Sequence, residues 1–347
     1  MSAKSTGKSA QSSSSSRGFD KELAELEALS EQVKSGGAFS AETVEHLRRA
    51  LGHRNNFLVS KAAKLVADAE LTALLPDVLA AYDRFFVDAV KSDPQCWAKN
   101  ALSKTLVKLE HRSKDAYLRG MRHHQLEPVW GGSSDTAGAL RSTCTHALVA
   151  CPGISDADLL TALLEPLTDT DKTVRAEAAR AIGQVGGVSA ALLLRLSSLL
   201  AKAEPEPEVM GAVYSSLLSL EPVAAIPLVA RAMEAGEDAA AEAAFALAEV
   251  RSAEALAALL ARWRAGADAW FGAVLLSAIA LTRLPEAMDF LIAMIARDAR
   301  EAPAAIDAVG RIAPNAEIVA RIAQAVEDAD SDRLRQAMRQ HFAGFAE

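Results

Sequence analysis

Residues 171–183 read DKTVRAEAARAIG, and no other stretch says as much about the fold of this chain. Val174, Ala178 and Ile182 recur at four-residue spacing, which places their side chains on one face of an α-helix. Ala178 and Ala179 are small, so a second helix can approach this face closely. We therefore expect a helix here whose apolar face is covered by neighbouring helices.

The same apolar pattern returns along the carboxyl half of the chain, where helix-length segments alternate with short turns. The positions that align are Val174, Val209, Ala239 and Trp270, then Ala178, Val213, Ala243 and Val274, then Ile182, Leu217, Leu247 and Ala278. The offsets between repeats are 35, 30 and 31 residues. One pair of helices cannot bury two apolar faces by itself, so this period predicts helix pairs that stack on one another.

Residues 171–183 resemble the second helix of a HEAT repeat. The residues that carry the resemblance are Asp171, Val174, Arg175, the pair Ala178 and Ala179, Ile182 and Gly183. The resemblance implies an all-α fold, a right-handed α-solenoid of HEAT-like helix pairs, in which Asp171 and Arg175 belong to a ladder of hydrogen bonds between repeats. It extends over residues 20–345 and is clearest over 155–285, although Asp238 lacks its arginine and the last two pairs keep only the apolar spacing.

Composition divides the chain into three parts. Residues 1–18, MSAKSTGKSAQSSSSSRG, contain almost no apolar side chains and cannot offset the entropy cost of ordering, so we expect a disordered Ser-rich tail. We expect residues 19–150 to form divergent helical repeats with an irregular loop at 120–138. Residues 151–347 are expected to form regular HEAT-like repeats that end in a polar capping helix.

Composition also narrows the class of protein. Apolar residues make up 50% of the chain and aromatic ones only 5%, which suits many closely packed helices. The sequence contains neither a membrane-spanning apolar run nor a signal-peptide pattern, and its three cysteines give no disulfide framework. We expect a cytoplasmic protein that does not contact membranes.

Charge is distributed unevenly between the two halves of the chain. Residues 41–150 contain 15 Lys and Arg against 12 Asp and Glu, whereas residues 151–347 contain 17 against 28. Phosphate contacts dominate the affinity of duplex-binding proteins, so the acidic carboxyl half argues against nucleic acid as the partner. We expect its acidic face to contribute to the binding of another protein.

The segment 111–140 interrupts the repeat pattern with a polar loop, and loops on repeat scaffolds often carry function. The candidate partner-binding residues are Arg119, Arg122, His123, His124, Gln125, Glu127 and Trp130. Hydrogen-bond donors, an acid and a large aromatic ring suit a peptide or an anionic group. In the alternative interpretation, Trp130 packs under the loop, Gly131 and Gly132 supply the turn, and the charged residues form a solvated rim.

The helix expected just before this loop carries a basic ridge. In WAKNALSKTLVKLEHR, residues 97–112, Lys104, Lys108 and Arg112 recur every four residues opposite an apolar face. Such a ridge either binds phosphate groups or is only the solvated side of the helix. It supports nucleic-acid binding as an alternative function.

Metal and catalytic motifs are not found in the sequence. His123, His124, Cys144, His146 and Cys151 are residue types that bind zinc, but their spacing does not suit a site. The chain also lacks the His-Glu dipeptides that supply the iron ligands of deoxyhypusine hydroxylase, a HEAT-like enzyme. We expect no metal and no cofactor.

The sequence thus favours a non-catalytic protein-interaction scaffold with an unidentified protein partner. Nucleic-acid binding and a lyase-type accessory role, as in phycobilin lyases, remain as alternatives.

Overall fold

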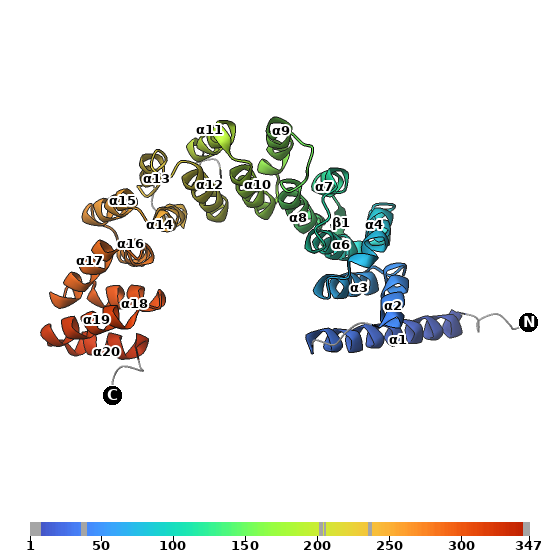
Figure 1. Ribbon diagram of the computed structural model, residues 1–347, viewed down its shortest axis with the longest axis horizontal. Coiled ribbons are helices and arrows are strands. Elements are labelled where there is room, and N and C mark those ends of the chain that lie inside the picture. The colour runs from blue at the N-terminus through green and yellow to red at the C-terminus, as the bar shows by residue number, and fades with distance from the viewer. Residues whose placement is uncertain (1–7, 36–39, 201–203, 205, 235–237, 343–347) are drawn as a thin grey trace, which may run out of the picture. The chain divides into compact units, whose positions relative to one another are not determined.

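The computed structural model describes residues 8–35, 40–200, 204, 206–234 and 238–342, and helices dominate all of these ranges (Figure 1). The first unit holds α1 (Lys8–Lys34), α2 (Ala41–Leu51), α3 (Asn56–Asp68), η1 (Thr72–Leu74), α4 (Leu75–Arg84), α5 (Ala89–Ser92), η2 (Pro94–Cys96), α6 (Trp97–Lys108), α7 (Lys114–Met121), β1 (Leu126–Val129), β2 (Gly132–Asp135), α8 (Gly138–Leu148), α9 (Asp156–Leu167) and the start of α10 (Lys172–Val185). Then follow α11 (Gly187–Leu199), α12 (Pro207–Leu220), α13 (Ile226–Ala232), α14 (Asp238–Val250), α15 (Ala253–Arg264), α16 (Ala269–Leu281), α17 (Pro285–Ala296), α18 (Ala302–Arg311), α19 (Ala316–Asp328) and α20 (Asp332–His341). The predicted all-α fold is confirmed.

The chain forms two compact units, Met1–Val174 and Arg175–Glu347. In the first unit, α1 packs on α3, α3 on α6 and α6 on α8, so alternate helices form a continuous layer. A second layer lies beside it, because α2 contacts both α3 and α4, and α7 packs against α8. Leu47, Leu58, Leu102 and Leu106 are fully buried between these layers.

The second unit repeats this arrangement more regularly. The helices α12, α14, α16, α18 and α20 pack one on the next, and α13 with α15 and α17 with α19 form the other layer. Ala243, Ala244 and Leu247 of α14 are completely buried, as the aligned register predicts for a helix with neighbours on both sides. Among the described residues, no helix is both long and apolar enough to cross a membrane.

The amino-terminal helix begins earlier than the sequence predicts. Residues 8–18, which we expected in a disordered tail, belong to α1, whereas residues 1–7 lie outside the described residues. Adding a residue to an existing helix costs far less than starting one, and Ser is only slightly worse than Ala inside a helix. The amphipathic part of α1, with Leu26 buried, therefore supplies a nucleus from which the helix extends backwards.

The predicted irregular loop at 120–138 contains a β-hairpin. Its strands β1 and β2 pair antiparallel from Leu126 opposite Asp135 to Val129 opposite Gly132, which leaves Trp130 and Gly131 at the turn. Gly131 has a φ of +88°, a conformation that side chains disfavour. Gly131 alone supplies the turn geometry, because Gly132 is not among the residues with positive φ. Sequence periodicity missed these strands because they are only four residues long and bury no apolar face.

Replacing Leu247 with Ala tests the packing of the second unit. The side chain is completely buried in α14, which contacts α12, α13, α15 and α16, so the substitution leaves a cavity. We expect the free energy of unfolding, measured by urea denaturation, to fall by about 2–5 kcal/mol. Val223→Ala is the matched control, since Val223 is an exposed apolar residue of the same unit, and its change should stay within about 0.5 kcal/mol. Equal losses for both variants would contradict a packed core at Leu247.

Candidate functional site

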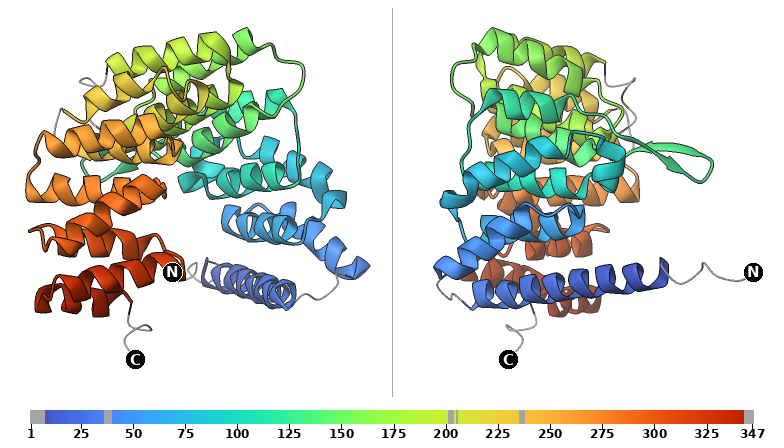
Figure 2. Two further views of the ribbon diagram at one scale, coloured as in Figure 1. Left: turned by 60° about the vertical axis from the view of Figure 1, so that its left-hand side comes forward. Right: turned by 90° about the vertical axis from the view of Figure 1, so that its right-hand side faces the viewer.

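The hairpin β1–β2 projects from the helices of the first unit, as the right-hand view of Figure 2 shows. Its tip is apolar. Trp130 is fully exposed, with a relative exposure of 103%, and the adjacent Val129 is exposed to 51%. Leu126, exposed to 64%, lies at the base of the hairpin opposite Asp135. The interpretation in which Trp130 packs under the loop is therefore wrong, because its ring has no cover within the described residues.

The base of the hairpin is fixed by the carboxylate of Asp135. Its Oδ1 accepts hydrogen bonds from the backbone N–H groups of Gln125 and Ala137, both at 3.0 Å. Its Oδ2 lies 2.8 Å from Nδ1 of His124 and accepts a bond of 2.8 Å from Nη1 of Arg141. Burial by itself would raise the pKa of Asp135, but these donors outweigh it and lower the pKa to about 2. The carboxylate is therefore ionised at neutral pH and closes the hairpin.

Arg141 connects this carboxylate to the start of α10. The side chain is 1% exposed, and it donates from Nε and Nη2 to the two oxygens of Asp169 at 2.7 and 2.9 Å. Nη1 also donates to the carbonyl oxygen of His123 at 3.1 Å. A buried guanidinium is tolerated when its fork of donors is satisfied in this way. Arg141 thus connects the segment before β1, the end of β2 and the segment preceding α10.

A second set of hydrogen bonds anchors the other side of the hairpin through Gln125 and Glu127. Gln125, 2% exposed, donates from Nε2 to the carbonyl oxygen of Asp93 at 2.8 Å and to Oε1 of Glu127 at 2.6 Å. The same Oε1 accepts from the N–H of Gln95 at 2.6 Å and from the hydroxyl of Thr136 at 2.8 Å. Burial would raise the pKa of Glu127, but these donors lower it. Glu127 is therefore an acceptor already occupied by its own chain.

A buried ion pair lies beneath this second set. Asp93 and Lys99 are both completely buried, with Nζ 2.9 Å from Oδ2. Asp93 also accepts from the N–H groups of Ala98 and Lys99 at the start of α6 and from Nδ2 of Asn56. Lys99 donates to the carbonyl oxygen of Phe85 at 3.2 Å. Removing one member of such a pair leaves the other charge buried and unpaired, so the pair is a structural element of the anchor.

The other residues predicted to bind a partner lie beside the hairpin base. Arg119 pairs with Asp83 and covers the ring of Phe86 at 4.9 Å, and Nε of Arg122 lies 3.8 Å from Glu165. His123 packs edge-on against Phe86, and burial lowers its pKa. Of the seven predicted residues, six contact other residues of the chain, Arg119 and Arg122 through their pairs with Asp83 and Glu165. Trp130 is the one whose side chain is fully exposed.

The basic ridge forms part of a groove between α3 and α6. Lys104 and Lys108 line a cavity of about 640 Å³ together with Lys61, Lys64 and Trp97. Two of the lysines have acidic neighbours, since Lys64 pairs with Asp68 and Lys108 with Glu70, both at 2.7 Å. Arg112 is not among the lining residues and lies 3.9 Å from Glu110. The ridge predicted from the sequence is thus joined by lysines of α3 that the sequence pattern did not single out.

The predicted ladder residues have different surroundings. Asp171 immediately precedes α10, and its Oδ1 accepts from the N–H of Thr173 at 2.9 Å. Arg175 donates from Nε and Nη2 to both oxygens of Glu204 at 2.7 and 2.8 Å, just ahead of α12. Sequence spacing indicated Arg175 but gave no sign of Glu204, which lies 29 residues further on.

In the second unit, three carboxylates lie close together on α12 and α14. Glu208, Glu242 and Glu249 line a groove of about 710 Å³. Burial raises the pKa of Glu242, and the carboxylates of Glu208, Glu249 and Asp238 raise it further. Carboxylates gathered in this way favour a cationic neighbour.

The residues weighed for zinc do not form a site. Within the described residues, the group with metal-ligand spacing includes none of His123, His124, Cys144, His146 or Cys151. Cys144 is buried beside the hydroxyl of Tyr82, and burial raises the pKa of its thiol to about 12. A thiol of that kind is not ionised at neutral pH and is a poor ligand.

Comparison with known proteins gives no family for this chain. No protein-family model matches it, and no curated protein is similar to it in sequence.

Replacing Asp135 with Asn tests the hairpin anchor. Since the folded pKa is about 2 and a free Asp titrates near 3.9, the carboxylate stabilises the folded state above pH ~4 and loses this effect as the pH falls towards 2. We expect Asp135→Asn to lower the free energy of unfolding by about 1.5–3 kcal/mol at pH 7, and by clearly less near pH 3. Asp88→Asn removes an exposed carboxylate of the same unit and should change little. A loss that is the same at both pH values would contradict the assigned role.

Proposed function

We propose that this protein is a non-catalytic scaffold that binds another protein through the tip of the β1–β2 hairpin. The observation that carries the proposal is the full exposure of Trp130 on a hairpin whose base is held by buried hydrogen bonds. Tryptophan is the residue type most enriched among those that dominate protein interfaces. Val129, next to Trp130 at the turn, extends the exposed apolar surface.

The energetics favour such a contact. Covering a tryptophan removes about 150–250 Å² of surface from water, which is worth roughly 4–6 kcal/mol before the costs of association. A partner that folds around a flexible loop must also offset the entropy lost on ordering it. Asp135 and Gln125 hold both ends of this hairpin in the free protein, so little of that cost remains for the hairpin.

The helical body acts as the support in this proposal. We infer a right-handed α-solenoid of HEAT-like pairs, in the cytoplasm, whose repeated layers present the hairpin and the acidic groove of Glu208, Glu242 and Glu249. The succession of alternate helices in contact, from α12 through α20, supports the inference because each repeat of a solenoid touches mainly its neighbours. The residues of DKTVRAEAARAIG provide the resemblance to that family.

A second candidate function is binding of single-stranded nucleic acid in the groove between α3 and α6. Lys61, Lys64, Lys104 and Lys108 line it, and Trp97, 45% exposed, stands beside the ring of Phe57 with centroids 5.6 Å apart. Lysines with exposed aromatic rings suit a phosphate backbone whose bases stack. Acidic neighbours of two lysines reduce the positive charge, and for that reason we rank this function second.

The first function is tested at the tip of the hairpin. A photo-crosslinking amino acid at position 130 should yield one discrete adduct in cells that encode the chain, whereas the same probe at Val87, an exposed apolar position of the same unit, should not. The purified adduct partner should then bind Trp130→Ala at least tenfold more weakly, which corresponds to about 1.4 kcal/mol, because the ring supplies most of the buried apolar area.

The melting temperature separates the proposal from its alternative. A fully exposed side chain contributes nothing to the core, so Trp130→Ala should have the same melting temperature as the wild type. Trp270→Ala, which removes an exposed tryptophan of the second unit, is the matched control for partner binding. Unchanged affinity in Trp130→Ala, or equal loss in Trp270→Ala, would refute docking by the hairpin tip.

The second function is tested by salt. Fluorescence anisotropy with a labelled single-stranded oligonucleotide should give an affinity whose logarithm falls with the logarithm of salt concentration by about 0.7 for each phosphate contacted. Lys61→Glu with Lys104→Glu should abolish binding, and Lys91→Glu, an exposed lysine that does not line the groove, should weaken it only slightly. No measurable binding at low salt would exclude this function.

A further inference from the structure

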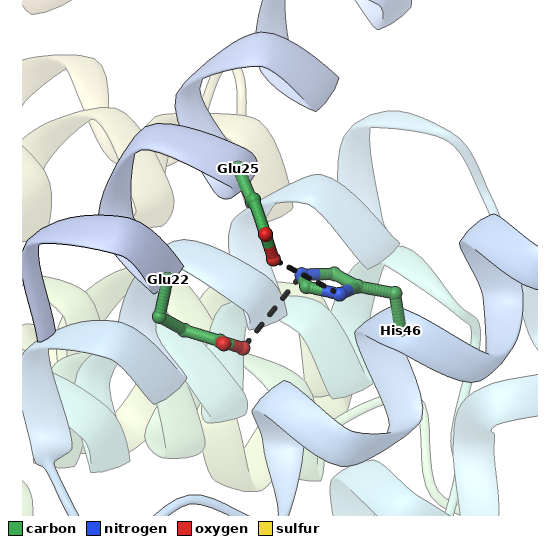
Figure 3. Close-up of side chains that lie close together, drawn as sticks. All are labelled: Glu22, Glu25 and His46. Carbon is green, nitrogen blue, oxygen red and sulfur yellow. Dashed lines mark ion pairs between the residues drawn. The ribbon is translucent and has the colours of Figure 1, made fainter. Parts of the chain in front are cut away.

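Three side chains with metal-binding atoms converge where α1 meets α2. Glu22 and Glu25 are three residues apart on α1, so their carboxylates leave the same face of the helix. His46 comes from α2, and Figure 3 shows both carboxylates directed at its imidazole ring. Oε1 of Glu22 lies 3.7 Å from Nε2, and Oε2 of Glu25 lies 3.6 Å from Nδ1.

Both helices pack on α3, and this packing fixes the arrangement. Leu26, next to Glu25, and Leu47, next to His46, are buried in the core of the first unit. Ser40 caps the start of α2, where its hydroxyl oxygen accepts from the N–H of Thr43 at 3.1 Å. The backbone positions of the three side chains are thus set by the fold.

The contacts among the three groups are too long for hydrogen bonds. The chain contains a proper pair of the same kind for comparison, since Nδ1 of His124 lies 2.8 Å from the carboxylate of Asp135. His46 is instead 0.8–0.9 Å further from its carboxylates, and its Nε2 is buried without a hydrogen-bond partner among the described residues. A buried polar atom in that state costs free energy unless something else satisfies it.

A metal ion matches this spacing. One ligand atom from each of the three residues lies within 4.8 Å of the others. Ligands bound at about 2.1 Å in a tetrahedral zinc site are roughly 3.4 Å apart, so side-chain movements that shorten these separations by up to about 1.4 Å would close the set. Two carboxylates also neutralise a divalent cation, which removes the repulsion between Glu22 and Glu25.

The surroundings leave room for a fourth ligand. The three residues line a cavity of about 720 Å³ with Lys21, Glu42 and Arg49, among others. Zinc sites that use three protein ligands keep an open position for water or a substrate oxygen. His46 is only 16% exposed, so the ion would be partly shielded while remaining reachable from the cavity.

We propose that Glu22, Glu25 and His46 bind one divalent transition-metal ion, Zn²⁺ in the first instance, through two carboxylate oxygens and an imidazole nitrogen. The ion links α1 to α2 and supplies the partner that Nε2 lacks. This site is separate from the hairpin, and its test leaves the docking proposal untouched.

Isothermal titration of the untagged, chelator-treated full chain with ZnCl₂ tests the site. We expect a single site and a rise in melting temperature with zinc, because a ligand that binds only the folded state stabilises it. Glu22→Gln with Glu25→Gln keeps the size and helical position of both side chains and should weaken binding by more than ~10-fold, as should His46→Gln. Glu42→Gln, in the same cavity, is the matched control and should bind as the wild type does.

If His46→Gln does not fold, the variant with both Glu22→Gln and Glu25→Gln still tests the site. Co²⁺ titration adds a direct readout, since a site of low coordination number gives visible absorption bands that the same variants should abolish. Absence of zinc binding to the wild-type chain would overturn the proposal. So would binding that persists in the double variant, which would place the ion elsewhere.

Discussion

The central helices of each unit carry apolar side chains that no single neighbour can cover. Leu247, Ala243 and Ala244 of α14 are completely buried only because α12, α13, α15 and α16 surround that helix. Small side chains on the helix let these neighbours come close. In each unit, the burial of the apolar side chains therefore depends on several successive helices packing together. The polar β1–β2 hairpin is not held by this packing and needs a separate explanation.

The hairpin interrupts the run and is stabilised by buried charge. A two-stranded hairpin is at best marginally stable in water by itself, and β1–β2 buries no apolar face. The missing apolar burial is compensated by hydrogen bonds of Arg141. Its guanidinium group, almost inaccessible to water, donates to the carboxylates of Asp135 and Asp169 and to a backbone carbonyl. Every donor left unpaired there would cost more than an ordinary hydrogen bond contributes, so the network favours one hairpin orientation over others.

The sequence predicted the helices well and the anchor poorly, for reasons visible in particular residues. Val174, Ala178 and Ile182 repeat at helical spacing, and local periodicity suffices to identify such a helix. Asp93 with Lys99 and Arg141 with Asp169 have no local signature, since a buried charge looks like a solvated one until its neighbours are known. The segment 119–130 was identified because it interrupts the helical repeat pattern. Four of its seven candidate residues, His123, His124, Gln125 and Glu127, nevertheless support the hairpin itself. The hypothesis that this segment binds a partner now rests on Trp130, whose side chain is fully exposed.

The exposure of Trp130 is better explained by the hydrogen bonds at the base of the hairpin than by flexibility of the loop. A flexible loop would let an indole ring fold back onto the nearest apolar surface, since covering it removes up to about 250 Å² from water. Asp135 and Gln125 hold the two strands at their bases, and Gly131 sets the turn, so these bonds oppose a movement of the hairpin towards the helices. Breaking them would leave the amide of Gln125, which is 2% exposed, without its acceptors, and a buried donor left unpaired costs about 1–3 kcal/mol. The hydrogen bonds at the base of the hairpin therefore favour the orientation in which Trp130 is exposed to water.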